Sequence, residues 1–159
     1  MKQLFLDFDG VLADFDTAAK QLFAQDSREA EATLGSEAFW SRIRGRDDFY
    51  RNLPLMADAM DLYEAVAHLK PIILTGCPEG GWAETQKIAW AAHHFPTAKM
   101  VTCRSKDKHL HIMNPGDVLV DDYLRYRELW EKAGWIFIHH ASAKESIRQL
   151  ATWGMEVRR

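Results

Sequence analysis

Cysteine is scarce in this sequence, and its two copies are not spaced as ligands. Cys77 and Cys103 lie far apart and match neither a CxxC redox pair nor a zinc-binding pattern. Their number excludes a disulfide framework, and we expect both residues to be reduced thiols.

Long hydrophobic runs are also missing. No apolar stretch approaches the roughly 20 residues that cross a bilayer as a helix. The first residues lead into a short apolar strand, without the charged start and cleavage site of a secretion signal. We therefore expect a cytoplasmic protein with no membrane partner.

Positive charge is not in excess, because 20 Lys and Arg residues stand against 23 Asp and Glu, for a formal net charge of −3. Without a strong positive field, nucleic acid is not the expected partner. The 159 residues are enough for one domain with a small inserted subdomain, and 47% hydrophobic residues is ordinary for a globular chain.

Three short apolar runs stand out, and each is too short for an amphipathic helix: residues 4–6, 71–74 and 118–120. Two weaker runs, residues 100–102 and 135–138, fit further strands of the same sheet. Such runs predict the buried strands of a parallel sheet. From residue 71 onward they alternate with helical patterns at 82–94, 123–132 and 142–150, which predicts an open α/β sheet with helices on both faces.

Residues 14–70 interrupt this alternation. They contain helical patterns at 14–25, 36–44 and 58–69 but no convincing strand. Ser36 is the expected N-cap of the middle helix. We interpret the segment as a helical insertion between the first and second strands.

Reactive polar residues follow the three strongest strands. Asp7 and Asp9 follow the first, Thr75 and Gly76 the second, and Asp121 and Asp122 the third. Because ligands of an open parallel sheet bind beyond the carboxyl ends of its strands, these groups should share one crevice. Four carboxylates in one crevice repel one another unless a cation is bound, and oxygen ligands without His or Cys favour Mg²⁺. A Mg²⁺ ion held in this way usually also binds a phosphate, so the pattern predicts a phosphorylated substrate.

The same residues supply the groups that phosphoryl transfer needs. Asp7 can attack phosphorus as a nucleophile, and Asp9 can protonate the leaving oxygen. The Thr75 hydroxyl and backbone N–H groups near Gly76 can bind phosphoryl oxygens. These residue types in this order therefore indicate a phosphohydrolase.

The chain resembles the haloacid dehalogenase (HAD) superfamily of phosphatases in four ordered motifs. Residues 7–14 (Asp-Phe-Asp-Gly-Val-Leu-Ala-Asp) resemble the first motif, 73–76 the second and 119–122 the fourth, while 106–108 contain a candidate third. The resemblance covers residues 3 to about 140. It implies an HAD-like three-layer α/β/α sandwich with a mostly parallel, Rossmann-like sheet in residues 1–13 and 71–159. A small helical cap, residues 14–70, would be inserted after the first strand.

The resemblance also implies roles for single residues. The chain would be an Mg²⁺-dependent phosphomonoesterase that forms an aspartyl-phosphate on Asp7, with Asp9 as general acid and then general base. Asp7, Asp121 and the backbone carbonyl of Asp9 would bind the metal, and Asp122 would support the metal's water shell.

A lysine completes the phosphate site, and the chemistry alone leaves Lys106 and Lys108 as candidates. Lys108 stands where the 5′(3′)-deoxyribonucleotidase branch of the superfamily keeps its lysine, and the helical insertion resembles the cap of that branch. The resemblance therefore implies Thr75, Gly76 and Lys108 as phosphate-binding residues and a small phosphorylated substrate, with a 5′-nucleotide as a candidate. The chain departs from the branch at Gly76, where the branch has Ser.

Two other functions stay open. A small cap leaves room for a polynucleotide end, so the chain could be a phosphatase of such ends. A phospho-accepting, receiver-like signalling protein uses similar groups around Mg²⁺, but it carries its acidic pair after the first strand and lacks the second acid that Asp9 provides. Seven residues of the insertion could either line a substrate pocket or form the cap's core and solvated face. They are Phe39, Trp40, Phe49, Tyr50, Arg42, Arg44 and Arg46.

Overall fold

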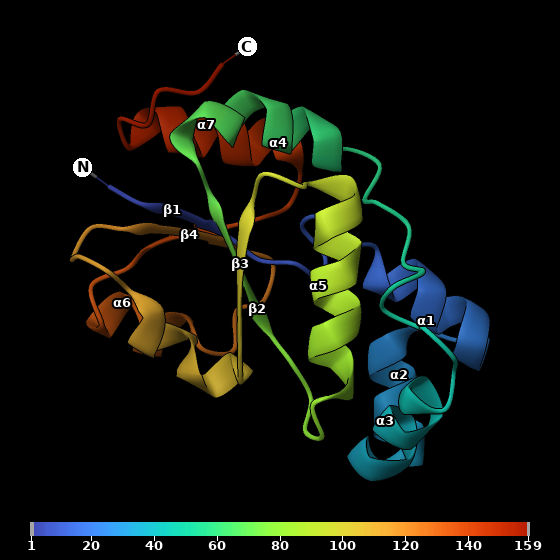
Figure 1. The fold of residues 1–159 in the computed structure, drawn as a ribbon. Coiled ribbons are helices and arrows are strands. Elements are labelled where there is room, and N and C mark those ends of the chain that lie inside the picture. The colour runs from blue at the N-terminus through green and yellow to red at the C-terminus, as the bar shows by residue number, and fades with distance from the viewer. Residues whose placement is uncertain (1, 159) are drawn as a thin grey trace.

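The computed structural model describes residues 2–158 and contains one sheet of five parallel strands (Figure 1). The strands are β1 (Leu4–Leu6), β2 (Ile72–Gly76), β3 (Lys99–Cys103), β4 (Val118–Asp121) and β5 (Ile136–His139). Their order in the sheet is β3-β2-β1-β4-β5. The predicted α/β fold, with a parallel sheet and helices inserted after the first strand, is confirmed.

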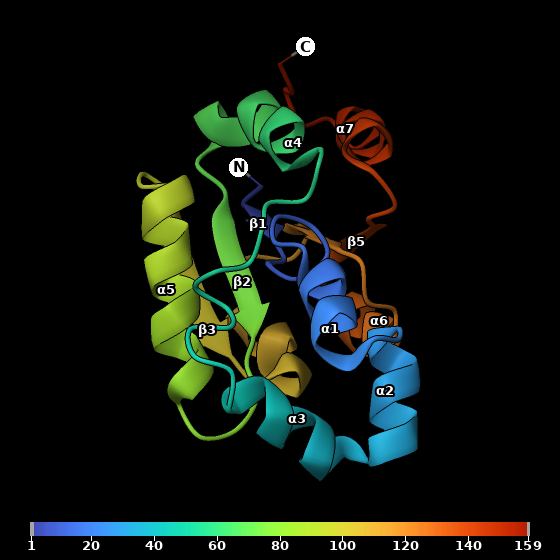
Figure 2. The same cartoon turned by 90° about the vertical axis from the view of Figure 1, so that its right-hand side faces the viewer.

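Helices cover both faces of the sheet. The helices are α1 (Phe15–Phe23), α2 (Ser27–Leu34), α3 (Ser36–Arg44), α4 (Ala59–Val66), α5 (Trp82–His94), α6 (Arg127–Lys132) and α7 (Ala143–Thr152). Two 3-10 segments are η1 (Ala67–Leu69) and η2 (Ser105–His111). Figures 1 and 2 show α2 and α3 towards the end of the molecule opposite α4 and α7, with α1 between them and the level of the sheet. In the described part of the chain, no helix is long and apolar enough to span a bilayer.

The pleat of β1 explains the two layers of core. Leu4 and Leu6 pack into a large cluster that includes residues of α4, α5 and α7. Phe5 points the other way, into a smaller cluster with Trp130 of α6. Because successive side chains of a strand face opposite sides, one apolar run fills both cores.

The chain enters and leaves the group α1–α3 through two segments that lie side by side. Asp14 N donates to Pro54 O, and Met56 N donates to Leu12 O, each at 2.8 Å. Helix α4, which the predicted insertion 14–70 includes, instead contributes Leu62 to the core cluster under the sheet and packs against α7. The helices that stand over the carboxyl ends of the strands are thus α1–α3.

Three local features differ from the predictions for identifiable reasons. Helix α2 was not predicted, because only Ser27 and Ala30 are buried in it and its apolar periodicity is therefore weak. Asp26 stabilises the start of α2 by accepting hydrogen bonds from two backbone N–H groups. Ser36 does not cap α3, because Gly35 holds the N-cap position and the Ser36 hydroxyl donates to Glu31 instead.

The third difference concerns the start of α6. The helix was predicted from residue 123 but begins at Arg127. The backbone N–H of Tyr123 donates to Asp121 Oδ1 at 2.9 Å, which holds the chain after β4 in a turn. The acid at the strand end therefore delays the helix.

One buried acid stabilises the fold without belonging to the acidic crevice. Asp117, directly before β4, is 1% exposed. Its carboxylate accepts hydrogen bonds from the backbone N–H groups of Gln3, Met113 and Asn114 at 2.8–3.0 Å. These bonds tie the start of β4 to the start of β1.

We expect Asp117→Ala to lower the free energy of unfolding by about 2–3 kcal/mol, because three backbone donors lose their acceptor. Urea denaturation measures this value. Glu64→Ala, at an exposed site on α4, is the matched control and should change stability by less than about 0.5 kcal/mol. A loss below about 1 kcal/mol for Asp117→Ala would contradict this role.

Candidate active site

The carboxyl ends of β1, β2 and β4 bring the predicted site residues together. Asp7 follows β1 directly, Thr75 and Gly76 end β2, and Asp121 ends β4. Since β1 lies between β2 and β4, the three strand ends are neighbours. Carboxylate oxygens of Asp7, Asp121 and Asp122 all lie within 4.8 Å of one another.

Lys108 lies among these acids. Its Nζ donates to Asp7 Oδ1 at 2.8 Å and to Asp121 Oδ2 at 2.7 Å, and the residue is only 3% exposed. Burial alone would lower the pKa of Lys108, but Asp7 and Asp121 outweigh it and raise that pKa. Lys106, the other candidate, is exposed at the edge of the cavity. Of the two lysines, the structure brings Lys108 to the acids.

Burial and mutual repulsion perturb the acids at the end of β4. Burial, followed by the charge of Asp7, raises the pKa of Asp121 to about 7 and that of Asp122 to about 9. A carboxyl group with such a pKa resists ionisation until a positive charge approaches. The group offers only oxygen donors, and these are the ligands that Mg²⁺ prefers. The residues present therefore fit a magnesium ion.

Asp9 stands apart from the group of three acids. Its Oδ2 accepts a hydrogen bond from Lys87 Nζ at 2.9 Å, while its Oδ1 is a buried atom with no hydrogen-bond partner in residues 2–158. Burial raises the pKa of Asp9, although Lys87 acts in the opposite direction. The two acids of the first motif thus have different environments.

Lys87 is the site residue that the sequence analysis missed. It lies on α5, and its side chain is completely buried. The buried residues of α5 are Ala83, Lys87, Trp90 and Ala91, a helical spacing that places Lys87 on the inward face. A lysine at a core position of this spacing is the signal that could have identified it, whereas the apolar Ile88 is 50% exposed.

Two glycines allow the acids and a neighbouring loop to approach the backbone. A Cβ atom on Gly10 would lie 2.0 Å from Asp122 Oδ2, and Gly10 also has a φ of +80°. A Cβ atom on Gly76 would lie 2.0 Å from Ser105 Oγ. Any side chain at either position would displace a neighbour that faces the site.

The acids line a cavity of about 1020 Å³ between the carboxyl ends of the strands and the cap helices α1–α3. Besides the acids, aromatic, basic and hydroxyl-bearing residues line it. Aromatic rings come from Phe15, Trp40, Tyr50, Trp82, Tyr123, Tyr126 and Trp130, positive charge from Arg28, Arg44, Arg104, Arg125, Lys106 and Lys108, and hydroxyl groups from Ser36, Ser41 and Ser105. The cavity therefore combines anion-binding groups with aromatic walls.

The insertion residues divide between core and cavity. Phe39 is 2% exposed and stacks on Phe23 with ring centroids 4.8 Å apart, so it belongs to the cap core. Trp40 and Tyr50 line the cavity. Arg44 also lines it, whereas Arg42 lies over the ring of Phe23.

The remaining two residues, Phe49 and Arg46, do not line the cavity. Phe49 is 6% exposed and packs edge-on against Phe15, with ring centroids 5.6 Å apart. Arg46 is exposed. The cap's contribution to the cavity wall thus consists of Trp40, Tyr50 and Arg44 among the seven residues considered.

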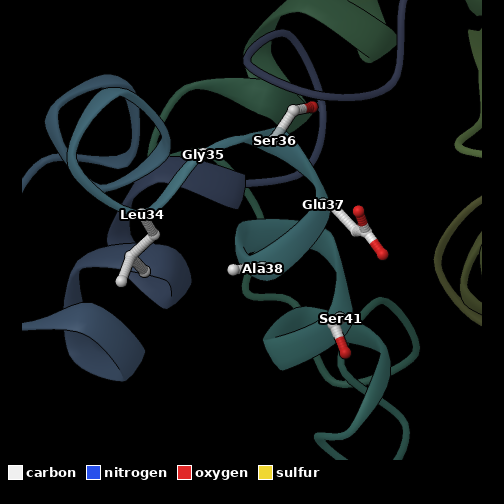
Figure 3. A pocket seen from close by; sticks show the side chains of 6 residues that line it. All are labelled: Leu34, Gly35, Ser36, Glu37, Ala38 and Ser41. Carbon is white, nitrogen blue, oxygen red and sulfur yellow. The ribbon is translucent and has the colours of Figure 1, made fainter.

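A second, smaller hollow of about 450 Å³ lies at the turn between α2 and α3 (Figure 3). Its polar side chains Ser36, Glu37 and Ser41 point away from Leu34, and these three residues also border the larger cavity. The hollow contains no group of acids or basic residues. The acids and Lys108 line the larger cavity instead.

The thiols are not candidates for the nucleophile. Cys77 and Cys103 are both free. Burial raises the pKa of Cys77 to about 12 and that of Cys103 to about 11. Because the thiolate is the reactive form of cysteine, thiols with such pKa values are unreactive at neutral pH.

Solved structures with the same arrangement of elements include a HAD-superfamily hydrolase from Ehrlichia chaffeensis. The TM-score is 0.59 at 12% identity, over 96% of this chain and 98% of that chain. A hydrolase from Streptococcus pneumoniae TIGR4 gives 0.56 at 16% identity, over 96% and 100% of the two chains. No protein-family model and no curated protein matches the sequence.

A third similar structure is L-2-haloacid dehalogenase from Xanthobacter autotrophicus with chloropropionic acid covalently bound. Its TM-score is 0.56 at 16% identity, and the match covers 96% of this chain and 83% of that chain. At identities of 12–16%, these matches show similarity of fold alone. The chain has the fold of HAD-superfamily hydrolases.

The contact between Gly76 and Ser105 yields a stability prediction. We expect Gly76→Ala to lower the free energy of unfolding by about 1–3 kcal/mol, because the new methyl group overlaps Ser105. Ser105→Gly removes the Oγ and Cβ atoms that cause most of the overlap, leaving Ser105 Cα at 2.9 Å. The double variant should therefore be more stable than the sum of the single changes by at least about 0.5 kcal/mol, as measured by chemical denaturation. Strict additivity would contradict the overlap.

Proposed function

We propose that this chain is an Mg²⁺-dependent phosphomonoesterase that acts through an aspartyl-phosphate intermediate on Asp7. The observation that carries the proposal is the group formed by Asp7, Asp121 and Asp122 within 4.8 Å, with Lys108 bonded to Asp7 and Asp121 and with Asp9 held separately beside it. A nucleophile, a proton donor, a cationic side chain and a metal-ligand set thus converge on one cavity.

In the first step a carboxylate oxygen of Asp7 attacks phosphorus, and the bond between phosphorus and the ester oxygen breaks. Asp9 gives its proton to that oxygen, and the alcohol leaves. In the second step Asp9, now a carboxylate, takes a proton from water as the water oxygen attacks phosphorus. The bond to Asp7 breaks, inorganic phosphate leaves, and both acids return to their starting state.

The metal would be held by carboxylates of Asp7 and Asp121 and by the backbone carbonyl of Asp9, with Asp122 beside it. When bound, Mg²⁺ supplies positive charge to the phosphoryl oxygens and offsets the repulsion among the acids. Lys108 supplies a further positive charge, and the hydroxyl of Thr75 and the backbone at Gly76 supply hydrogen bonds to the transferred group.

The chemistry is supported by the contrast between the two acids of the first motif. The dehalogenase of the same fold has its chloropropionic acid covalently bound, which supports a covalent intermediate in this chain as well. A second acid held next to the nucleophile gives a route for protonating an ester oxygen and later for activating water. Asp9 therefore favours phosphate-ester hydrolysis.

The walls of the cavity support a small substrate, and we propose a nucleoside 5′-monophosphate as its class. Trp40 and Trp82, both half-buried, offer aromatic faces on which a base can stack, and Arg44 offers a donor for a second polar group. A volume of about 1020 Å³ is at the upper end for small-ligand cavities. The cap helices over the cavity favour a mononucleotide over the end of a polynucleotide.

The first test uses the nucleophile. With Mg²⁺ the wild-type protein should hydrolyse p-nitrophenyl phosphate or nucleoside monophosphates, and Asp7→Asn should lower kcat at least about 10³-fold because the amide cannot attack phosphorus. Initial rates measure the loss, and circular dichroism checks the fold. Asp61→Asn, an exposed acid on α4, is the matched control and should retain full activity.

Two results would contradict the proposal. One is a wild-type protein that hydrolyses neither kind of substrate with Mg²⁺. The other is a phosphorylated Asp7 that persists for hours, which would indicate a receiver-like protein.

The second test addresses substrate class. Trp40→Ala should raise KM for a nucleoside 5′-monophosphate about tenfold, because one stacking surface for the base is lost, and should leave KM for glycerol phosphate unchanged. Trp153→Ala, at an exposed tryptophan outside the cavity, is the control. Preferential hydrolysis of a 3′-phosphorylated oligonucleotide over mononucleotides would favour the polynucleotide-end alternative.

A further inference from the structure

A second buried lysine, Lys87, has no part in the steps above, and its surroundings are unusual for a lysine. The side chain is completely buried within the fold, and Lys87 does not line the cavity. Its Nζ lies 5.0 Å from the ring centroid of Phe8 and 4.5 Å from that of Tyr50. The ammonium group is thus enclosed between a core ring and a cap ring.

All three N–H donors of this ammonium group are used. Nζ donates to Asp9 Oδ2, to Thr75 Oγ1 and to the backbone oxygen of Gly76, each at 2.9 Å. The three acceptors come from two segments, the loop after β1 and the end of β2. Lys87 therefore joins the first two motifs through one atom.

Stability alone does not account for a lysine at this position. Removing an ammonium group from water is costly, and apolar residues of similar volume often replace buried ion pairs without loss of stability. The neighbouring inward positions of α5 are occupied by Ala83, Trp90 and Ala91, so an apolar side chain would suit the helix face. The polar contacts of Lys87 are all with residues of the proposed catalytic site, which points to a role there.

We infer that Lys87 is a positioning residue that fixes the side chain of Asp9 for catalysis. This inference rests on the proposed function. Holding one Asp9 oxygen restricts rotation of the carboxyl group, which would otherwise be free to turn towards the other acids. The bonds to Thr75 Oγ1 and to the backbone oxygen of Gly76 anchor the ammonium group to the end of β2, where the Thr75 hydroxyl itself donates to Gly76 O at 3.5 Å.

The two buried lysines consequently act on different parts of the reaction. Lys108 lines the cavity and contacts Asp7, so it acts on the transferred group directly. Lys87 lies behind Asp9 and acts through it. Its loss should impair protonation of the leaving oxygen more than attack by Asp7.

Leaving-group dependence separates this role from a general structural one. p-Nitrophenolate is a weak base and departs with little help from an acid, whereas the alkoxide of a nucleoside 5′-monophosphate needs a proton. We expect Lys87→Met to lower kcat/KM for the nucleotide on the order of 10²-fold and for p-nitrophenyl phosphate by less than about tenfold. The same comparison in an Asp9→Asn background should show almost no further effect of Lys87→Met on the nucleotide.

Two further variants complete the experiment. Ser146→Ala removes a completely buried hydroxyl that is hydrogen-bonded to His140 and lies outside the cavity. It tests whether loss of a buried polar group alone changes the ratio of kcat/KM for the nucleotide to kcat/KM for p-nitrophenyl phosphate. Lys87→Gln keeps an N–H donor and is measured in the same way if Lys87→Met does not fold. Inhibition by inorganic phosphate, which reports an intact phosphate site, should change less than about threefold in these variants.

An equal loss of kcat/KM for both substrates in the Lys87 variants, or full additivity with Asp9→Asn, would overturn the inference while leaving the proposed function intact. An inactive wild-type protein would instead refute the proposed function and this inference with it. A selective loss with the nucleotide that disappears in the Asp9→Asn background would support the positioning role.

Discussion

The neutralisation of buried acids at the carboxyl edge of the sheet is the constraint on which the site depends. The ionisable groups involved are the buried Asp7, Asp121, Lys87 and Lys108 and the half-buried Asp9 and Asp122. Burying such groups costs more desolvation energy than an apolar core, and leaving one partner alone commonly costs about 3–5 kcal/mol. The arrangement is therefore poorly explained as a stabilising device. The proposed function explains it better, because a bound cation and a phosphoryl group would bring in charges that balance those of the acids and lysines.

The pleat of the sheet decides which lysine meets which partner. Thr75 follows Ile73 by two residues on β2, so both side chains lie on the face covered by α5, and Thr75 meets Lys87 there. Asp121 follows Leu119 by two residues on β4, on the face covered by α6 and η2, and it meets Lys108 there. The two ammonium groups thus approach the site from opposite faces of the sheet. This separation keeps Asp9 apart from the three clustered acids, as its different role in the proposed reaction requires.

The sequence was sufficient for the features that follow from local patterns. The strands were visible as short apolar runs, and the residues after β1, β2 and β4 converge because parallel strands end at one edge. Features that depend on tertiary contacts were not visible in the same way. From the sequence alone, Lys87 would be taken as a solvent-exposed helix residue. The burial of Ala83 and Trp90 shows that its face of α5 turns inward. The choice between Lys106 and Lys108 likewise required the path of η2, a tight segment whose side chains follow no simple apolar period.

The cap is linked to Asp9 through Tyr50 and Lys87. Tyr50 lines the cavity, its ring covers the Lys87 ammonium group, and its backbone N–H donates to Gln86 Oε1 at 2.9 Å. Gln86 and Lys87 are adjacent on α5, so Tyr50 makes both a cap contact and a contact to the lysine that holds Asp9. A substrate that moved Tyr50 would therefore also change the surroundings of Lys87. In the proposed reaction, Tyr50 would therefore link the cap wall of the cavity to the residue that positions the proton donor, and so link recognition of the leaving group to its protonation.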